Sequence, residues 1–103
     1  MGKAKEVKLI DIAGADFIGG RYVGEVVRQE IEEAINANST IVIDFSGIKG
    51  VTQSFADEAI GILIRAFGIQ TVKNHVKVKN ANDKIRLVLN WVASYSKKYA
   101  IPT

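Results

Sequence analysis

The segment over residues 40–68 constrains the fold most strongly, because it joins a short apolar run to a glycine-containing turn and a long apolar helical pattern. The run over residues 41–45 is almost continuously apolar and β-branched. Such a run predicts a strand buried on both faces, as in a parallel sheet. The serine and glycines that follow indicate a turn. Apolar residues at helical spacing over residues 55–67 then predict a helix.

Ser54 stands at the start of this predicted helix, and Asp57 follows three residues later. This spacing is close to a capping box, so we expect the Ser54 oxygen to accept a backbone N–H of the first turn. Asp57 and Glu58 also favour the positive end of the helix dipole. The sequence therefore predicts a strand, a turn and a serine-capped helix, which together form its one candidate functional surface.

The flanking segments alternate between strand and helix patterns. We predict strands over residues 7–13 and 72–80, and amphipathic helices over residues 22–37 and 83–99. Arg28 and Glu32 are spaced to pair on the first of these helices. The order βαβαβα predicts an α/β layered fold with a mainly parallel sheet and helices packed on it. Residues 1–103 suffice for a single domain of this kind.

The last predicted helix begins after Asn80 or Asn82, either of which can cap it. Its inner stripe consists of Ile85, Val88, Leu89, Val92 and Tyr99. Leu87 and Trp91 fall outside that stripe. They are either covered by the tail at residues 101–102 or exposed for a partner, and they are compatible with a homodimer.

The helix over residues 55–67 is apolar around most of its circumference. A helix of this kind is either enclosed by the fold or forms an interaction surface. Because complete burial is hard to arrange in so small a domain, we favour the interaction surface. The candidate partner-binding residues are Thr52, Phe55, Glu58, Ile62, Ile64 and Arg65.

Composition excludes several classes of function. There is no cysteine and only one histidine, His75, which excludes thiolate and multi-histidine metal sites. No stretch approaches the about 18 apolar residues of a membrane span, and the first residues do not form a signal peptide, so we expect a cytoplasmic protein. The net charge of +3 comes from dispersed lysines, which argues against nucleic-acid binding.

The strand, turn and serine-capped helix resemble the STAS domains of anti-sigma factor antagonists, and more closely the bacterial STAS-like family of unknown function. The resemblance covers about residues 17–80, and it is strongest in the Ser-Phe-Ala-Asp-Glu block that begins at Ser54. Residues 43–48 and Arg21 with the Gly-Glu pair at 24–25 also match. The antagonists usually read Asp-Ser-Ser/Thr-Gly where this chain has Thr-Gln-Ser-Phe at residues 52–55.

The resemblance implies a small regulatory module without a cofactor site, so we expect no cofactor. In the antagonists, the corresponding serine is phosphorylated by a partner kinase that is also an anti-sigma factor, and phosphorylation abolishes binding. It implies Ser54 as the phosphosite and a kinase or anti-sigma-type ATPase as the protein partner. From the residues alone, Ser54 is either a helix cap, which we favour, or a phosphosite at a helix N-terminus.

The other polar residues have simpler interpretations. Arg21, with Thr52 and Ser54, forms an alternative nucleotide- or anion-binding set, although the glycines before Arg21 lack phosphate-loop spacing. Lys73, Lys77 and Lys79 would be the contacts of a nucleic-acid-binding domain, a third alternative. We expect Asp44 to fix the following turn and His75 to lie at the surface. No nucleophile, base and acid can be grouped from the sequence, so we expect no enzyme.

Overall fold

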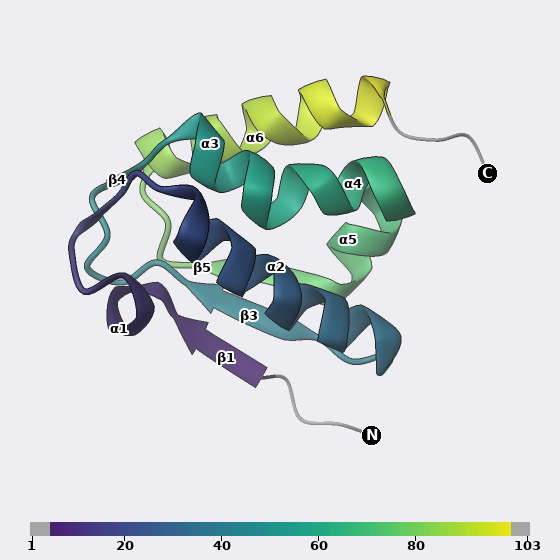
Figure 1. The fold of residues 1–103 in the computed structure, drawn as a ribbon, viewed down its shortest axis with the longest axis horizontal. Coiled ribbons are helices and arrows are strands. Elements are labelled where there is room, and N and C mark those ends of the chain that lie inside the picture. The colour runs from purple at the N-terminus through teal and green to yellow at the C-terminus, as the bar shows by residue number, and fades with distance from the viewer. Residues whose placement is uncertain (1–4, 100–103) are drawn as a thin grey trace.

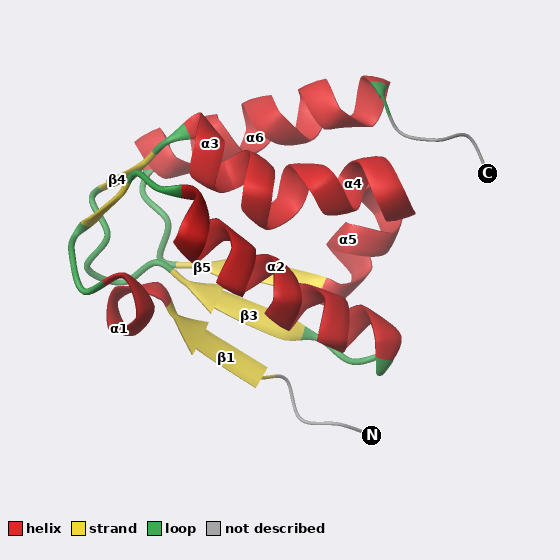
Figure 2. Cartoon of the chain, viewed as in Figure 1, coloured by secondary structure: helices red, strands yellow, loops and turns green. Residues whose placement is uncertain are grey.

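The computed structural model describes residues 5–99. Its main sheet has three parallel strands, β1 (Lys5–Lys8), β3 (Ile41–Asp44) and β5 (Val76–Lys79), in the order β1-β3-β5 (Figures 1 and 2). Val7 aligns with Ile43 in β3, and Ile43 aligns with Val78 in β5. The apolar run thus forms the central strand, and the N-terminal strand lies at an edge.

The helices gather on one side of this sheet (Figure 1). α2 (Arg21–Asn36) lies beside a continuous helical rod made of α3 (Gln53–Ala56), the π-helical segment η1 (Asp57–Gly61) and α4 (Ile62–Phe67). α6 (Asp83–Lys98) packs against the rod and is capped by the side chain of its preceding asparagine. The predicted α/β fold and the βαβαβα order of its main elements are confirmed. Within residues 5–99, no helix is long and apolar enough to cross a membrane.

The opposite face of the sheet carries no helix among the described residues (Figure 1). Successive side chains of a strand point to opposite faces, so Ile41 and Ile43 are buried whereas Val42 is only half-buried. The residues aligned with Val42 are Glu6 and Lys77, and both are exposed. The expectation of a central strand buried on both faces is therefore wrong, because the helices cover one face only.

The predicted first strand over residues 7–13 is wrong from Leu9 onward. β1 ends at Lys8, and α1 (Leu9–Ala13) follows and ends at Gly14, which has a φ of +66°. Leu9, the first residue of this short helix, is fully buried. Lys8 aligns with Asp44, the last residue of β3, so the chain leaves the sheet at this point.

The predicted third strand over residues 72–80 also begins as a helix. α5 (Ile69–His75) leads directly into β5, and Val72 is buried on its inner side. His75 is half-buried at the end of α5, where its Nδ1 donates a hydrogen bond to the Ser39 carbonyl at 2.7 Å. It is therefore a contact between α5 and the turn before β3, in contrast to the surface residue that we expected.

Two very short strands lie in segments for which no strand was predicted. β2 (Phe17–Ile18) pairs in parallel with β4 (Gly50–Val51). The Thr52 backbone N–H continues this ladder by donating to the Ile18 carbonyl at 3.0 Å. This pairing fixes the point at which the chain enters α3, next to the start of α2.

Asp44 fixes the turn after β3, as predicted. Its Oδ1 accepts hydrogen bonds from the Asn80 side chain at 3.0 Å and from the Ser46 hydroxyl and backbone N–H at 2.7 and 2.9 Å. These donors lower the pKa of Asp44 to about 2, because they stabilise the ionised carboxylate, and Asn80 has the largest effect. Asp44 therefore joins the carboxyl ends of β3 and β5 through its Oδ1.

Candidate functional site

Thr52, rather than Ser54, caps the helix that begins at Gln53. The Thr52 Oγ1 accepts the Phe55 backbone N–H at 3.1 Å, and its hydroxyl donates to the Gly19 carbonyl at 3.1 Å. The prediction that Ser54 caps the helix is wrong, because the pairing of β2 with β4 makes Thr52 the last extended residue. Ser54 is the second residue of α3, and its side chain is not needed to begin the helix.

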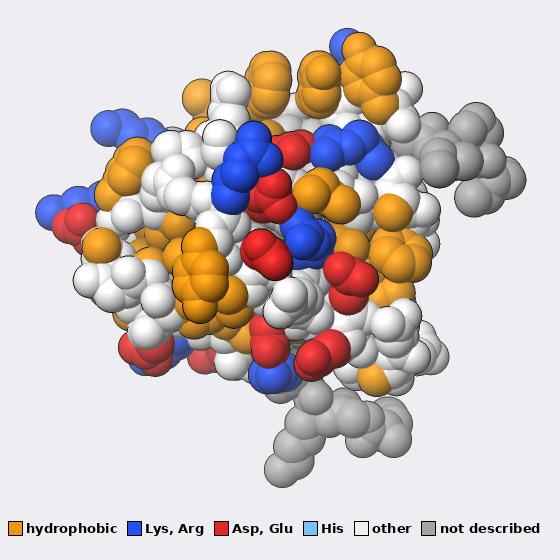
Figure 3. All heavy atoms as spheres, in the orientation of Figure 1, with side chains coloured by type: hydrophobic (Ala, Val, Ile, Leu, Met, Phe, Trp, Pro, Cys, Tyr) orange, Lys and Arg blue, Asp and Glu red, His pale blue; other side chains and the backbone are white. Residues whose placement is uncertain are grey.

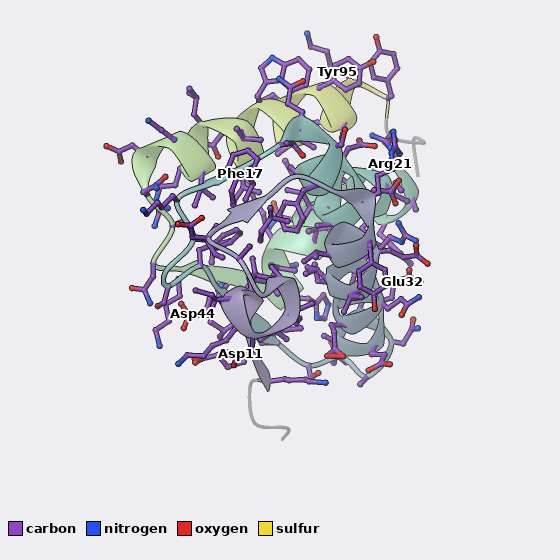
Figure 4. All side chains as sticks on the ribbon, turned by 60° about the vertical axis from the view of Figure 1, so that its left-hand side comes forward. Asp11, Phe17, Arg21, Glu32, Asp44 and Tyr95 are labelled. Carbon is purple, nitrogen blue, oxygen red and sulfur yellow. The ribbon has the colours of Figure 1, made fainter. Side chains whose placement is uncertain are left out.

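Ser54 is exposed on the first turn of α3, where it borders a groove of about 480 Å³ between α3 and α6. We call this the α3–α6 groove; its lining residues are Arg21, Gln53, Ser54, Asp57, Arg65, Trp91, Val92, Tyr95 and Tyr99. In Figure 4, Arg21 and Tyr95 lie in the upper part of the molecule and Asp44 in the lower part. The fold thus brings together Ser54, Arg21 and Arg65, three residues that the sequence identified as candidates.

Glu58 joins α2 to η1 through two arginines. Its Oε2 accepts from the Arg28 Nη1 at 2.6 Å, and its Oε1 accepts from the Arg21 Nη1 at 2.6 Å. The hydrogen bond from Arg28, followed by that from Arg21, holds the pKa of Glu58 below its usual value. Arg28 also forms the predicted pair with Glu32, at 3.7 Å. Glu58 is therefore occupied within the domain, whereas the Arg21 side chain remains 70% exposed and accessible to an anion.

Arg65 joins the helical rod to α6. Its Nη1 donates to Asp57 Oδ1 at 2.7 Å and to the Ser96 hydroxyl at 3.0 Å, and Ser96 is fully buried. The hydrogen bond to Asp57 is the main cause that holds the pKa of Arg65 above its usual value. This cluster forms one wall of the groove and holds α6 against the rod. Arg65 is only half-buried, so its guanidinium also places a positive charge at the groove.

The outer side of α6 carries a row of large exposed side chains, which we call the α6 ridge. Leu87, Trp91, Tyr95 and Tyr99 recur every four residues and are 73%, 51%, 47% and 61% exposed. Trp91 and Tyr95 stack with ring centroids 5.4 Å apart, and Tyr95 and Tyr99 follow at 5.0 Å. Figure 3 shows hydrophobic side chains gathered along this edge of the molecule.

The placement of Leu87 and Trp91 outside the inner stripe is confirmed, whereas Tyr99, assigned to that stripe, is exposed. The tail at residues 101–102, considered as a cover for these side chains, lies outside the described residues. Tyr95 was missed by the sequence reasoning. Its signal was present, because it continues the four-residue spacing of Leu87 and Trp91.

Two of the candidate partner-binding residues are inside the domain. Phe55 and Ile64 are each 1% exposed, so neither side chain lies on a docking surface, while Ile62 is half-buried. The rod is enclosed because α2 and α6 pack on two of its sides and the sheet lies below. The close contact with α2 depends on Gly24, where an added Cβ would lie 2.7 Å from the Glu58 Cβ and 2.8 Å from the Phe55 carbonyl oxygen.

The alternative binding sets are only partly assembled. Arg21 and Ser54 share the groove, but the Thr52 hydroxyl is engaged as the helix cap. Lys73 lies on α5, whereas Lys77 and Lys79 lie on β5, so the three lysines do not lie on the one strand predicted over residues 72–80. No group of three histidine, cysteine or acidic residues within residues 5–99 is placed to hold a metal ion.

The fold and the groove define a small α/β domain in which a parallel sheet supports a helix entered from the carboxyl end of its central strand. A family model described as a STAS-like domain of unknown function matches residues 23–86, which is more than half of the chain. The chain belongs to this family. Searches of curated proteins and of solved structures gave no significant match.

Proposed function

We propose that this protein is a non-enzymatic regulatory module that binds a protein partner through the α6 ridge and the α3–α6 groove. The observation that supports this most directly is the ridge, in which four large apolar side chains remain exposed in one row. Contiguous exposed apolar surface of this kind marks interaction sites on soluble domains. Tryptophan, tyrosine and arginine are also the residues that contribute most to binding energy at protein interfaces.

The polar residues beside the ridge support a regulatory role over a catalytic one. Asp57 and Glu58 are paired with arginines, and the one histidine is bonded to a carbonyl. These side chains are engaged in contacts within the domain, which suits recognition better than proton transfer. Arg21 is the exception, because its side chain is mostly exposed at the mouth of the groove.

Phosphorylation of Ser54 would gate this surface. A phosphate on the first turn of α3 would meet free backbone N–H groups and the positive end of the helix dipole. It would add a charge of about −2 within the groove that Asp57 and Arg21 also line. Arg21 would then turn from Glu58 toward the phosphate, and an apolar or acidic partner would be rejected. By family resemblance, a kinase or anti-sigma-type ATPase is the class of partner that fits.

Site-specific photo-crosslinking tests this proposal. A photoreactive phenylalanine analogue replaces Tyr95 on the ridge or, as a matched control, Tyr22, which is 74% exposed on α2 and does not line the groove. In native lysate we expect position 95 to capture one specific protein and position 22 to miss it. Adding Ser54→Glu should abolish that adduct while Ser54→Ala retains it. Equal adducts at both positions would remove the ridge as an interface, and an unaffected adduct in Ser54→Glu would remove the gate.

Anion or nucleotide binding is the second candidate, because Arg21 and Ser54 share the groove with the stacked rings of Trp91 and Tyr95. A ligand that binds only the folded state raises the melting temperature. Phosphate, ATP and GTP at millimolar concentration should then raise it in wild type and fail to do so in Arg21→Ala. The absence of any shift in wild type would leave protein binding as the sole function of the groove.

A further inference from the structure

A second cavity lies between β5, α5 and the inner side of α6. We call it the β5–α6 cleft; it has a volume of about 190 Å³. Its floor includes the buried side chains of Ile43, Phe55 and Ile64. Leu89 and Ala93 line it from α6, on the side of that helix away from the α6 ridge. The cleft is therefore separate from the α3–α6 groove.

The interior of this cleft is apolar. Apart from the residues at its mouth, every lining side chain is aliphatic or phenylalanine. Protein interiors leave few voids larger than a water molecule, and a dry cavity of roughly 150 Å³ can hold a benzene-sized ligand. The cleft is thus large enough for a ring or a short acyl chain, and such a group would gain free energy by leaving water.

The mouth of the cleft is positively charged. Its exposed lining residues include Lys73 on α5 and Arg86 and Asn90 on α6, and no carboxylate of residues 5–99 lines the cleft. Arg86 Nε donates to the Ala81 carbonyl at 3.1 Å, which orients the guanidinium while its terminal N–H groups can serve another acceptor. This arrangement complements an anion at the end of an apolar group.

The π-helical segment contributes to the same cleft. Ala59 and Ile60 of η1 both line it. A π-helical turn widens the helix and shifts the side chains that follow relative to a regular α-helix. Such turns occur frequently at functional sites. The irregular turn thus lies where it shapes a cavity, which adds a second observation to the charge of the mouth.

We propose that the β5–α6 cleft binds a small amphipathic anion, with its acyl chain or ring among the apolar side chains and its anionic head at Lys73 and Arg86. A medium-chain carboxylate has this chemistry. The site shares no lining residue with the α3–α6 groove, so it stands whether or not a protein binds the α6 ridge.

Titration of the whole chain with octanoate, followed by amide NMR shifts, tests the proposal. We expect saturable shifts at Val78, Leu89 and Ala93. The double variant Lys73→Gln/Arg86→Gln should weaken octanoate binding by roughly tenfold and leave 1-octanol binding unchanged, because only the charge-assisted contacts are removed. The double variant Lys84→Gln/Lys97→Gln, which also removes two positive charges, here from α6 outside the cleft, should bind octanoate like wild type.

The apolar half of the site is tested with Ala93→Leu, which should fill the cleft and reduce binding of both ligands. Circular dichroism checks that this variant folds; if it does not, the exposed lysine and arginine variants still decide the outcome. The absence of saturable shifts in wild type at low millimolar octanoate overturns the proposal. So does equal octanoate affinity in wild type and the double variant, or unchanged binding of both ligands in a folded Ala93→Leu.

Discussion

Thr52 and Ser54 lie two positions apart at the start of the same helix and have different physical roles. Thr52 bonds both the helix N-terminus and the Gly19 carbonyl, whereas Ser54 is exposed on the first turn. Thr52→Ala should therefore lower the free energy of unfolding by about 1 kcal/mol, and Ser54→Ala by less than about 0.5 kcal/mol. Urea unfolding measures both values, and an equal or larger loss in Ser54→Ala would contradict the assignment of the cap.

Asn80 supports the charged form of Asp44 and has a left-handed backbone, with φ +61°. Asn80→Gly keeps that backbone accessible and removes the amide, so the pKa of Asp44 should rise from about 2 toward its ordinary value of 3.8. Carboxyl NMR against pH measures this change. Asn38→Gly is the matched control, since Asn38 has φ +52° and no bond to Asp44. An unchanged Asp44 titration in Asn80→Gly would refute the role of the amide.

The same shift predicts how stability depends on pH. Because the folded pKa of Asp44 lies below its unfolded value, its contribution is complete above the unfolded value of 3.8 and is lost as the pH falls toward about 2. In Asn80→Gly this loss should be smaller, since the folded and unfolded pKa values lie closer together. Unfolding free energies of the two proteins at several pH values between these limits show the difference in slope.

At the scale of elements, the packing of α2 on the helical rod depends on Gly24. A helix-interior Gly→Ala change ordinarily stabilises by up to about 1 kcal/mol. At Gly24 we expect the opposite sign, a loss of about 1–3 kcal/mol, because the new methyl group would overlap the Glu58 side chain and the backbone of Phe55. Glu25→Ala, on the exposed side of the same turn, should change stability by less than about 0.5 kcal/mol. A Gly24→Ala variant more stable than wild type would contradict this prediction, because it would show that α2 and the helical rod can move apart at little energetic cost.

Long elements could be predicted from the sequence because their apolar spacing repeats over several turns. α2 and α6 begin and end within one residue of the predicted bounds. Short segments lacked this repetition. Val72 and Val76 are four residues apart, a spacing that suits a helix as well as the alternation of a strand. In the structure Val72 lies in α5, whereas Val76 is the first residue of β5. The two-residue strands β2 and β4 have no local signal, since only their pairing with each other defines them.

The candidate site was only partly predictable for a related reason. Arg21 and Ser54 were identified from residue type and position, and the fold brings them to one groove. The choice of Thr52 as the cap depends on the pairing of distant strands, which a local capping pattern does not include. Ile64 is buried because helices flank the rod, so a glutamate there would disrupt the core and would not report on partner binding.

At the scale of the whole molecule, β5 is an edge strand whose second edge has no strand partner among residues 5–99. An exposed edge offers unpaired backbone groups to another chain, and lysines on such a strand oppose that pairing. Lys77 and Lys79 alternate with Val76 and Val78 along β5, and both lysines are exposed. We infer that their charge keeps the sheet from extending between molecules.

Lys77→Ile tests this role by making three consecutive residues of β5 apolar and β-branched. We expect the variant to fold, because its side chain lies on the open face of the sheet, and to self-associate with rising concentration. Light scattering and size-exclusion chromatography measure the association. Lys84→Ile makes the same change on exposed helix surface and should remain like wild type, because it adds no apolar residue to an open strand edge. If both variants associate equally, the cause is surface hydrophobicity and not the edge; if neither does, the lysine is not needed to protect β5.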